Sequence, residues 1–300
     1  MNHKQNLPVK GTNLWHAILT LPVWAFLLIL ITSCQSLSNE QSDENNPDSR
    51  SNLTLASIEL QPGRFNENTG DAFKEKQMNY PRVREAYTSK ADSVKRLLAR
   101  KGIHTFSIDL FLRLFKKEQT VEVWAKREEV DTFTHIVDYP FCASSGDLGP
   151  KRQEGDYQIP EGFYRISYFN PHSDYHLSLK LNYPNQSDRI KGHPENPGSN
   201  IYIHGDCVTI GCIPITDPYI KELYVLAVEA HASGNDRIPV HVFPTHLKAP
   251  EWQALQAQNK GRQKLLDFWK DLRPGYLAFE QNKTLPKIHV GEEGSYVVTE

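Results

Sequence analysis

Residues 201–217 read Ile-Tyr-Ile-His-Gly-Asp-Cys-Val-Thr-Ile-Gly-Cys-Ile-Pro-Ile-Thr-Asp, and the rest of the chain is best understood from this stretch. It places one histidine, two cysteines and two glycines between an apolar strand-like start and the beginning of a helix. A cysteine that acts as a nucleophile needs a base within hydrogen-bond reach and backbone N–H groups beside it. Cys212 could be that nucleophile, because Gly211 permits a turn that a β-carbon would block. His204, eight residues upstream, could be the base.

Two other interpretations of the same residues stay open at this point. Cys207 and Cys212 could be buried apolar side chains or the halves of a disulfide. Alternatively, His204 and three cysteines, with Cys142 as the third, offer an imidazole and three thiolates, which suit zinc. Zinc is disfavoured because no pair of these cysteines has the two-residue spacing usual in structural zinc sites. We therefore expect no metal.

The overall composition is that of an ordinary globular protein. The chain has 300 residues, of which 39% are hydrophobic and 23% charged, which is enough for one sizeable core with appendages. The formal net charge of -2 gives no basic excess that would indicate nucleic acid as a partner. We therefore expect no nucleic-acid binding.

Residues 1–33 have the pattern of an export signal. A basic start with Lys4 and Lys10 precedes an apolar run at 17–31, which ends in Ile-Thr-Ser before Cys34. This arrangement looks like a bacterial lipoprotein signal, in which the cysteine becomes the lipid-modified first residue of the mature chain. The alternative is an uncleaved membrane anchor, although the fifteen-residue run is shorter than the ~17–25 residues of a spanning helix. In both cases we expect an extracytoplasmic protein held at a bacterial membrane, on the periplasmic side.

The cysteine count gains meaning from that location. The chain has four cysteines, and lipid on Cys34 would leave Cys142, Cys207 and Cys212, an odd number in an oxidising compartment. At least one thiol is then left over within the monomer. Such a thiol is either paired between chains or kept free for chemistry.

Residues 34–78 are predicted to form a flexible tether. They are rich in Ser, Asn, Asp and Glu and contain few large apolar side chains, so they bury too little surface to offset the entropy of ordering them. A compact domain is expected from residue 79 onward. Apolar residues recur at helical spacing from Pro81 to Lys101, and Gly102 supplies a stop.

Alternating apolar residues predict a β-rich core within residues 79–248. Phe106–Phe115 and Thr120–Ala125 alternate on either side of a polar four-residue turn, which is typical of a hairpin. Shorter runs of strand type follow at Thr134–Val137, Gly162–Tyr168, Tyr175–Leu181, Ile201–Ile203 and Pro239–Phe243.

Helices are expected after this core. Asp217 is a candidate N-cap before Pro218, and apolar residues recur at helical spacing from there to a stop at Gly234. Residues 249–300 are predicted to be a helical extension packed on the same domain. Its expected elements are helices at Glu251–Gln258 and Gly261–Leu272, a break at Arg273-Pro274-Gly275 and a last strand near Ile288. The expected fold class is therefore α+β, mostly β.

Two motifs in the opening stretch resemble a known family. Ile203-His204-Gly205 and Thr209-Ile210-Gly211-Cys212 resemble the His-Gly and Ser/Thr-x-Gly-Cys signature of the L,D-transpeptidase (YkuD-type) catalytic domain of bacterial cell-wall enzymes. Further motifs resemble the murein L,D-transpeptidase-like branch, and they lie at 112–118, 149–156, 159–164, 181–185 and Asp188-Arg189. The resemblance spans roughly Ser93 to His246. It implies a mixed β-sheet core with flanking helices, peptidoglycan stem peptides as partners, and no cofactor.

The resemblance also assigns roles to individual residues. Cys212 would attack a carbonyl at an L-centre of a stem peptide, typically diaminopimelate at position three, forming a thioester and releasing D-alanine. His204 would act as general base and then as general acid. Gly211 would shape the oxyanion loop, and Thr209 would support it. These residues form the predicted catalytic set.

Substrate contacts are expected at Gly205, Tyr183 and Arg189. The evidence for the last two is weaker than for the catalytic set, because Tyr183, Asp188 and Arg189 could equally form a structural ion-pair corner. A disulfide between Cys142 and Cys207 would leave Cys212 free and would fit the odd count, but the sequence alone does not fix the pairing.

The acceptor of the acyl group is left open by two departures from the family pattern. Pro214 stands where many members have arginine or asparagine, and Ile210 where a histidine is common. An amine acceptor would give a transpeptidase for cell-wall remodelling, whereas water would give a hydrolase that cleaves murein cross-links or the bond to a murein-linked protein. A rival of another class is a non-catalytic murein-binding lipoprotein.

Overall fold

The computed structural model describes residues 67–299, so the predicted export signal, the lipidation site Cys34 and most of the predicted tether lie outside the described part. Its helices are α1 (Glu67–Met78), α2 (Pro81–Ala99), α3 (Gln186–Lys191), α4 (Asp217–Ala232), α5 (Ala249–Gln258) and α6 (Gln263–Asn282). The strands of its main sheet are β1 (Asp109–Phe115), β2 (Thr120–Lys126), β3 (Thr134–Pro140), β4 (Gly162–Asn170), β5 (Ser178–Leu181), β6 (Tyr202–His204), β7 (Ile213–Pro214) and β8 (Pro239–Phe243). A separate strand pair is β9 (Lys287–Val290) with β10 (Tyr296–Thr299).

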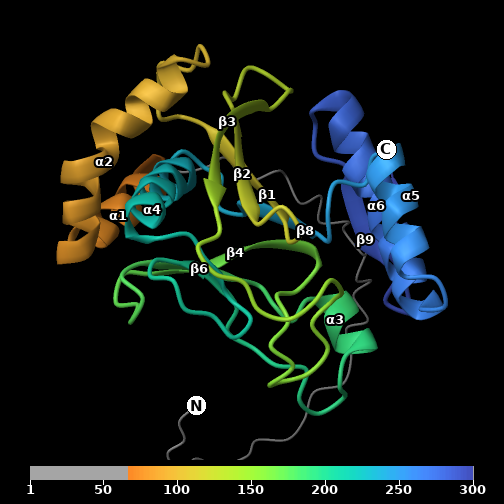
Figure 1. The fold of residues 1–300 in the computed structure, drawn as a ribbon. Helices are drawn as coiled ribbons and strands as arrows, with labels where there is room; N and C mark the ends of the chain where they lie inside the picture. The colour runs from red at the N-terminus through yellow and green to blue at the C-terminus, as the bar shows by residue number, and fades with distance from the viewer. Residues whose placement is uncertain (1–66, 300) are drawn as a thin grey trace, which may run out of the picture. The chain divides into compact units, whose positions relative to one another are not determined.

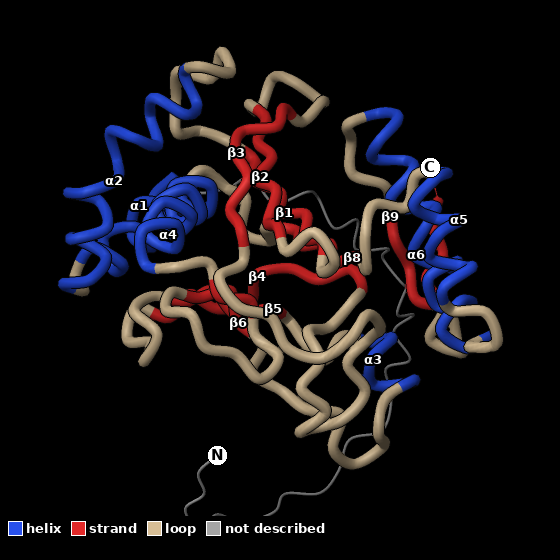
Figure 2. Tube along the Cα trace, in the orientation of Figure 1, coloured by secondary structure: helices blue, strands red, loops and turns tan. Residues whose placement is uncertain are grey.

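The main sheet is mixed and has the strand order β3-β2-β1-β8-β4-β5-β6-β7. β1 and β2 form the predicted antiparallel hairpin, in which Phe115 is paired with Thr120 across the turn. β8 runs parallel to β1, and β7 runs parallel to β6 at the far edge. Figure 2 shows long loops, drawn in tan, in the part of the fold around α3 and β6. The stretch 201–217 therefore lies at one edge of the sheet, among loops.

Helices cover the sheet from two sides (Figure 1). α1, α2 and α4 gather on one side, and α5, α6 and the β9–β10 pair on the other. β1 shows the consequence, because Leu110, Leu112 and Leu114 belong to the core shared with α4, whereas Phe115 packs with the aromatic residues of α6. Both faces of this strand are therefore buried, so its alternating pattern does not mark one buried and one solvent-exposed face.

The predicted α+β class is confirmed, with a mixed sheet flanked by helices. The helical share is larger than expected, since α1 and the second half of α6 lie where no helix was predicted. No helix among the described residues is both long and apolar enough to cross a membrane.

The predicted tether, residues 34–78, extends too far toward the carboxyl end, because its last residues form a helix. α1 occupies its last twelve residues and packs on α4, where a β-carbon on Gly70 would lie 2.0 Å from the carbonyl oxygen of Ala232. Lys74 forms an ion pair with the mostly buried Glu229 at 2.8 Å. The α1 sequence is too polar to indicate a helix, and contacts with α4 supply the stability that its own composition lacks.

The predicted break at residues 273–275 was also wrong, because α6 continues through Pro274 to Asn282. A proline inside a helix removes one backbone hydrogen bond, but the apolar face of α6 stays buried beyond it at Tyr276 and Phe279. Gly275 permits the close approach of the sheet, since a β-carbon there would lie 2.7 Å from the ring of Phe163. Burial of this face against the sheet outweighs the local cost of the proline.

Candidate active site

The pairing of β6 with β7 brings His204 and Cys212 to the same edge of the sheet. Ile203 is paired with Ile213 and His204 with Pro214, so Cys212, one residue before β7, lies opposite Tyr202. Successive side chains of a strand point to opposite faces. Ile203 and Ile213 are both fully buried, so His204, the next residue of β6, points to the other face, whereas Cys212 lies in the bend that leads into β7.

The turn before Cys212 is held by Thr209 and strongly favours glycine at residue 211. Gly211 has φ of +134°, and a β-carbon on it would lie 3.0 Å from the carbonyl oxygen of Gln158. The hydroxyl of Thr209 accepts a hydrogen bond from the N–H of Gly211 at 3.1 Å and donates to the carbonyl oxygen of Cys212 at 2.7 Å. The half-buried thiol of Cys212 points toward the carbonyl oxygen of Asn200, 3.6 Å away.

His204 is buried and held in one tautomer. Its Nδ1 lies within hydrogen-bond distance of the carbonyl oxygen of Gly205, and its ring packs on that of Tyr175 with centroids 4.7 Å apart. A carbonyl oxygen only accepts, so Nδ1 carries the proton and the lone pair of Nε2 can receive one. No hydrogen bond joins the imidazole to the thiol of Cys212 in the described chain.

Burial keeps both groups neutral at rest. It raises the pKa of the Cys212 thiol above its ordinary value, and the N–H of Tyr202 and the nearby cation of Lys151 offset this only in part. Burial lowers the pKa of His204, against smaller opposing effects of the Gly205 carbonyl and Asp206. The favoured resting pair is therefore a thiol and a neutral imidazole rather than a thiolate and an imidazolium.

The loop between His204 and Cys212 is fixed by Asp217 and by a disulfide. The carboxylate of Asp217 accepts a hydrogen bond from the N–H of Asp206 at 2.9 Å. Cys207 is joined to Cys142, and the N–H of Cys142 donates to the carbonyl oxygen of Pro214 at 2.9 Å. The disulfide leaves Cys212 as the free cysteine of the described chain.

The same disulfide removes two of the thiolates that the zinc alternative required. Cys142 and Cys207 are bonded to each other and cannot bind a metal as thiolates. Among residues 67–299, no group of three or more His, Cys, Asp and Glu side chains is placed to hold a metal ion.

The three predicted substrate contacts lie in different surroundings, and they stay predictions. Gly205 packs tightly, since a β-carbon there would lie 2.4 Å from a carboxylate oxygen of Asp217. Tyr183 is buried, and its hydroxyl donates to the carbonyl oxygen of Pro197 at 2.7 Å. Arg189 is exposed in the last turn of α3. The contacts of Gly205 and Tyr183 are those of residues that shape loops.

The neighbouring Asp188 has a structural role. It is buried, forms a capping box with Asn185 at the start of α3, and accepts a hydrogen bond from the hydroxyl of Tyr164 at 3.0 Å. The guanidinium of Arg152 lies 3.4 Å from its other oxygen. The alternative from the sequence was an ion-pair corner of Tyr183, Asp188 and Arg189, whereas the ion pair that the structure gives Asp188 is with Arg152.

Three residues near Cys212 were not singled out from the sequence. Asp217 was assigned only to the start of a helix, and the N-cap position is instead occupied by Thr216, whose φ is +68°. Gln158 supports Gly211 from a distant loop, and Lys151 contributes positive charge near the thiol. Only Asp217 had a local signal, since it closes the stretch 201–217.

Comparison with known families identifies a match over the core of the fold. The L,D-transpeptidase catalytic domain family (YkuD) matches residues 111–242, from β1 to β8. YafK of Escherichia coli (strain K12), whose name assigns it L,D-transpeptidase activity provisionally, is 33% identical over 192 residues. That alignment covers 63% of this chain and 74% of YafK.

Two solved structures that match part of the chain are distant in sequence and have low TM-scores. The helical cell shape determining protein Pgp2 from Campylobacter jejuni is 17% identical with a TM-score of 0.37, over 62% of this chain and 73% of Pgp2. Bd1075 from Bdellovibrio bacteriovorus is 19% identical with a TM-score of 0.34, over 65% of this chain and 79% of Bd1075.

Proposed function

The chain belongs to the L,D-transpeptidase catalytic-domain family, and from this premise we propose that it is a cysteine-dependent enzyme that acts on peptidoglycan stem peptides. The observation that supports the proposal is the pairing of β6, which ends at His204, with β7, which follows Cys212 directly, with Cys212 kept free while Cys207 is bonded to Cys142. The reaction is the exchange of one amide bond for another through a thioester on Cys212.

In the first half of the reaction, Nε2 of His204 takes the thiol proton as the sulfur attacks the carbonyl carbon at the L-centre of the donor peptide. The tetrahedral intermediate collapses to a thioester, and the departing D-alanine amine receives the proton from the imidazolium. Thiol and imidazole are not hydrogen-bonded at rest, and catalytic contacts of this kind commonly close only when substrate is bound. The neutral resting pair supports proton transfer during attack rather than a preformed thiolate.

The developing oxyanion needs N–H donors that are not already used. The N–H of Gly211 is taken by the hydroxyl of Thr209, so the N–H of Cys212 itself is the nearer candidate. The same hydroxyl holds the carbonyl of Cys212, which fixes the orientation of the adjoining peptide units. Thr209 therefore acts as a positioning residue for the oxyanion loop.

In the second half, an amine acceptor attacks the thioester while His204 takes its proton, and the sulfur leaves as a thiolate that is reprotonated by the imidazolium. Water in place of the amine would release a free carboxylate, which is the hydrolase alternative. Pro214, which stands where many family members have arginine or asparagine, is buried in β7 and offers no polar side chain to an acceptor. The identity of the acceptor is thus the part of the proposal that experiment must decide.

We place the enzyme outside the cytoplasm, anchored by lipid on Cys34. The export-type pattern of residues 1–33 supports this location, and a disulfide in the catalytic region is what an oxidising compartment permits. Metabolic labelling with a fatty acid would test the anchor, because Cys34→Ser should abolish the label. Label retained by that variant would exclude this site.

The test of the activity uses the full chain in detergent with a disaccharide tetrapeptide from murein, and product masses are measured. Cys212→Ala should abolish product, whereas Cys207→Ala should retain it at a reduced level. Full activity of Cys212→Ala would overturn the assignment, and loss confined to Cys207→Ala would move the nucleophile. The mass of the product separates an amine acceptor from water.

A further inference from the structure

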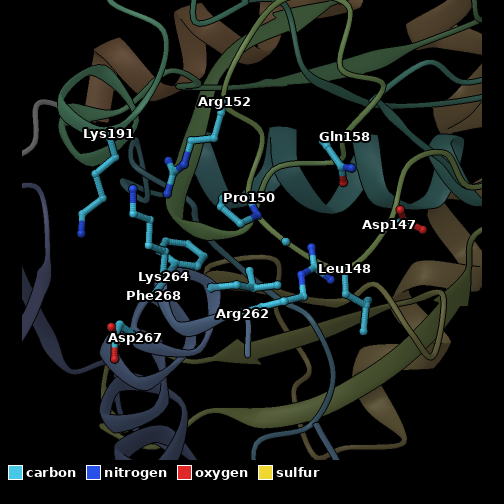
Figure 3. A pocket seen from close by; sticks show the side chains of 12 residues that line it. Asp147, Leu148, Pro150, Arg152, Gln158, Lys191, Arg262, Lys264, Asp267 and Phe268 are labelled. Atoms are coloured by element: carbon cyan, nitrogen blue, oxygen red, sulfur yellow. The ribbon is translucent and has the colours of Figure 1, made fainter. Parts of the chain in front are cut away.

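A basic pocket lies between the loop 147–158 and the start of α6 (Figure 3). Its volume is about 570 Å³. Part of its lining, from Arg262 to Phe268, belongs to the C-terminal extension and lies beyond the residues 111–242 that match the L,D-transpeptidase family. Part of the pocket therefore lies outside the segment that the family model matches.

Cations outnumber anions in this pocket. Arg152, Lys191, Arg262 and Lys264 line it together with Asp147 and Asp267. Figure 3 shows Arg152, Lys191 and Lys264 toward one end, together with the single carboxylate of Asp267, and Asp147 with Gln158 toward the other. One end of the pocket is thus positively charged.

Two of these cations make no ion pair within 4.0 Å in the described chain, although Lys191 lies close enough to Asp271 to offset part of the rise that burial causes in the pKa of that carboxyl group. Neither Lys191 nor Lys264 forms an ion pair or a side-chain hydrogen bond among residues 67–299. Arg152 has two partners within the chain, because its guanidinium lies 3.4 Å from Asp188 and stacks on the ring of Phe268 at 5.0 Å. The pocket accordingly offers two ammonium groups that are not tied up in close ion pairs, beside a guanidinium that packing holds in place.

The pocket adjoins the catalytic turn. Gln158 lines it, and the carbonyl oxygen of the same residue is the atom that a β-carbon on Gly211 would meet at 3.0 Å. Lys151, next to Arg152 in the chain, lies close enough to Cys212 to lower the pKa of its thiol. The segment 151–158 therefore contributes both to this pocket and to the surroundings of the proposed nucleophile.

Both walls of the pocket are fixed to one buried group. Glu161 is fully buried and accepts hydrogen bonds from the N–H of Gly149 at 2.7 Å and from the indole of Trp269 at 2.7 Å. Lys116 pairs with the same carboxylate at 3.2 Å and donates to three carbonyl oxygens of the loop. The loop wall and the α6 wall are thus held to one another, which makes this a preformed pocket rather than a chance gap.

We infer that this pocket binds a free carboxylate of the murein peptide, at a distance from the bond that Cys212 attacks. Stem peptides carry carboxylates that do not react, and a guanidinium with two ammonium groups is the chemistry that recognises them. The inference rests on the proposed function, because it takes the ligand to be the substrate of that site. It gives the C-terminal extension a role in substrate selection.

The test measures binding rather than turnover, so it is separate from the test of catalysis. The full chain carrying Cys212→Ala is titrated by calorimetry with three probes, which are the disaccharide tetrapeptide, the same compound with its carboxylates amidated, and inorganic phosphate. Adding Lys191→Ala with Lys264→Ala should weaken tetrapeptide binding about tenfold, as expected for the loss of two exposed charge contacts. Lys270→Ala, a lysine of α6 outside this pocket, is the matched control and should leave the affinity unchanged.

The amidated peptide should bind the parent and the double variant with equal, weakened affinity, and added salt should weaken only the carboxylate form. Lys264→Arg as a single change should keep most of the tetrapeptide affinity of the parent, because the positive charge is retained. Equal tetrapeptide affinity in the parent and the double variant would overturn the inference. Phosphate binding that matches the tetrapeptide, with no loss on amidation, would also overturn it by showing a site for free anions. Failure of turnover in the unmodified chain, with carboxylate-dependent binding intact, would instead count against the proposed function alone.

Discussion

Replacing Glu161 by glutamine should destabilise the protein strongly, although the change is nearly isosteric. The carboxylate is fully buried and is the charged partner of Lys116, whose side chain is only 3% exposed. It also accepts hydrogen bonds from the N–H of Gly149 and the indole of Trp269 through different oxygens. A glutamine has one acceptor oxygen, so it can satisfy only one of these two donors.

The size of the effect follows from these contacts. Removing one partner of a buried ion pair costs about 3–5 kcal/mol because the other charge is left uncompensated. Lys116 keeps three carbonyl acceptors, each at 2.8 Å, so we expect the cost of leaving its charge unpaired to lie near the lower end of that range. The unsatisfied donor adds about 1–3 kcal/mol. We expect a total of about 4 kcal/mol, and a lower pKa of Lys116, because burial already lowers that pKa and Glu161 is the first group opposing it.

Equilibrium unfolding in urea measures the loss directly, and thermal unfolding should show a midpoint lower by roughly 10 °C. Glu154→Gln, an exposed position on the same loop, is the matched control and should change stability by less than about 0.5 kcal/mol. A loss below about 1 kcal/mol for Glu161→Gln would refute the view that this pair fixes the loop beside Gly211.

Further predictions concern the active site itself. The rate of Cys212 alkylation by iodoacetamide should rise with pH to a midpoint above the ordinary thiol value of about 8.5, because burial raises the pKa of this thiol; a midpoint near 7 would indicate a preformed ion pair with His204. Thr209→Val should lower kcat/KM by about tenfold with little change in the melting temperature, since it removes two hydrogen bonds of the oxyanion loop; unchanged kinetics would exclude a positioning role. Combining Cys142→Ser with Cys207→Ser should cost about 2–4 kcal/mol in urea unfolding, and reduction of the unmodified chain should do the same; equal midpoints before and after reduction would contradict this.

Local patterns predicted most of the elements of this fold. The alternation at Phe106–Phe115 and Thr120–Ala125 indicated the β1–β2 hairpin, and Pro218 with the stop at Gly234 indicated α4. α1 could not be predicted in this way, because its helix depends on packing against α4 rather than on an apolar face of its own. Pro274 and Gly275 suggested a break because both residues disfavour the interior of a helix. In the structure the helix continues through them, and Gly275 permits the close approach of Phe163.

The sequence indicated the candidate reacting groups of the site but not the residues that hold them in position. Cys212 and His204 lie within one short stretch, so their spacing and motif were visible in the sequence. The contacts of Gln158 with Gly211 and of Cys142 with Cys207 join residues more than fifty positions apart, and nothing local marks such pairs. The same is true of Trp269, whose link to Glu161 joins the C-terminal extension to the loop beside the site.

The most direct test of the central claim is the intact mass of the full chain after incubation with a stem peptide or a carbapenem-type acylating probe, followed by mapping of the modified residue. The account predicts one acyl adduct located on Cys212, absent in Cys212→Ala and formed more slowly in His204→Gln. Product formed without any adduct on Cys212, or an adduct on another residue that persists in Cys212→Ala, would contradict it.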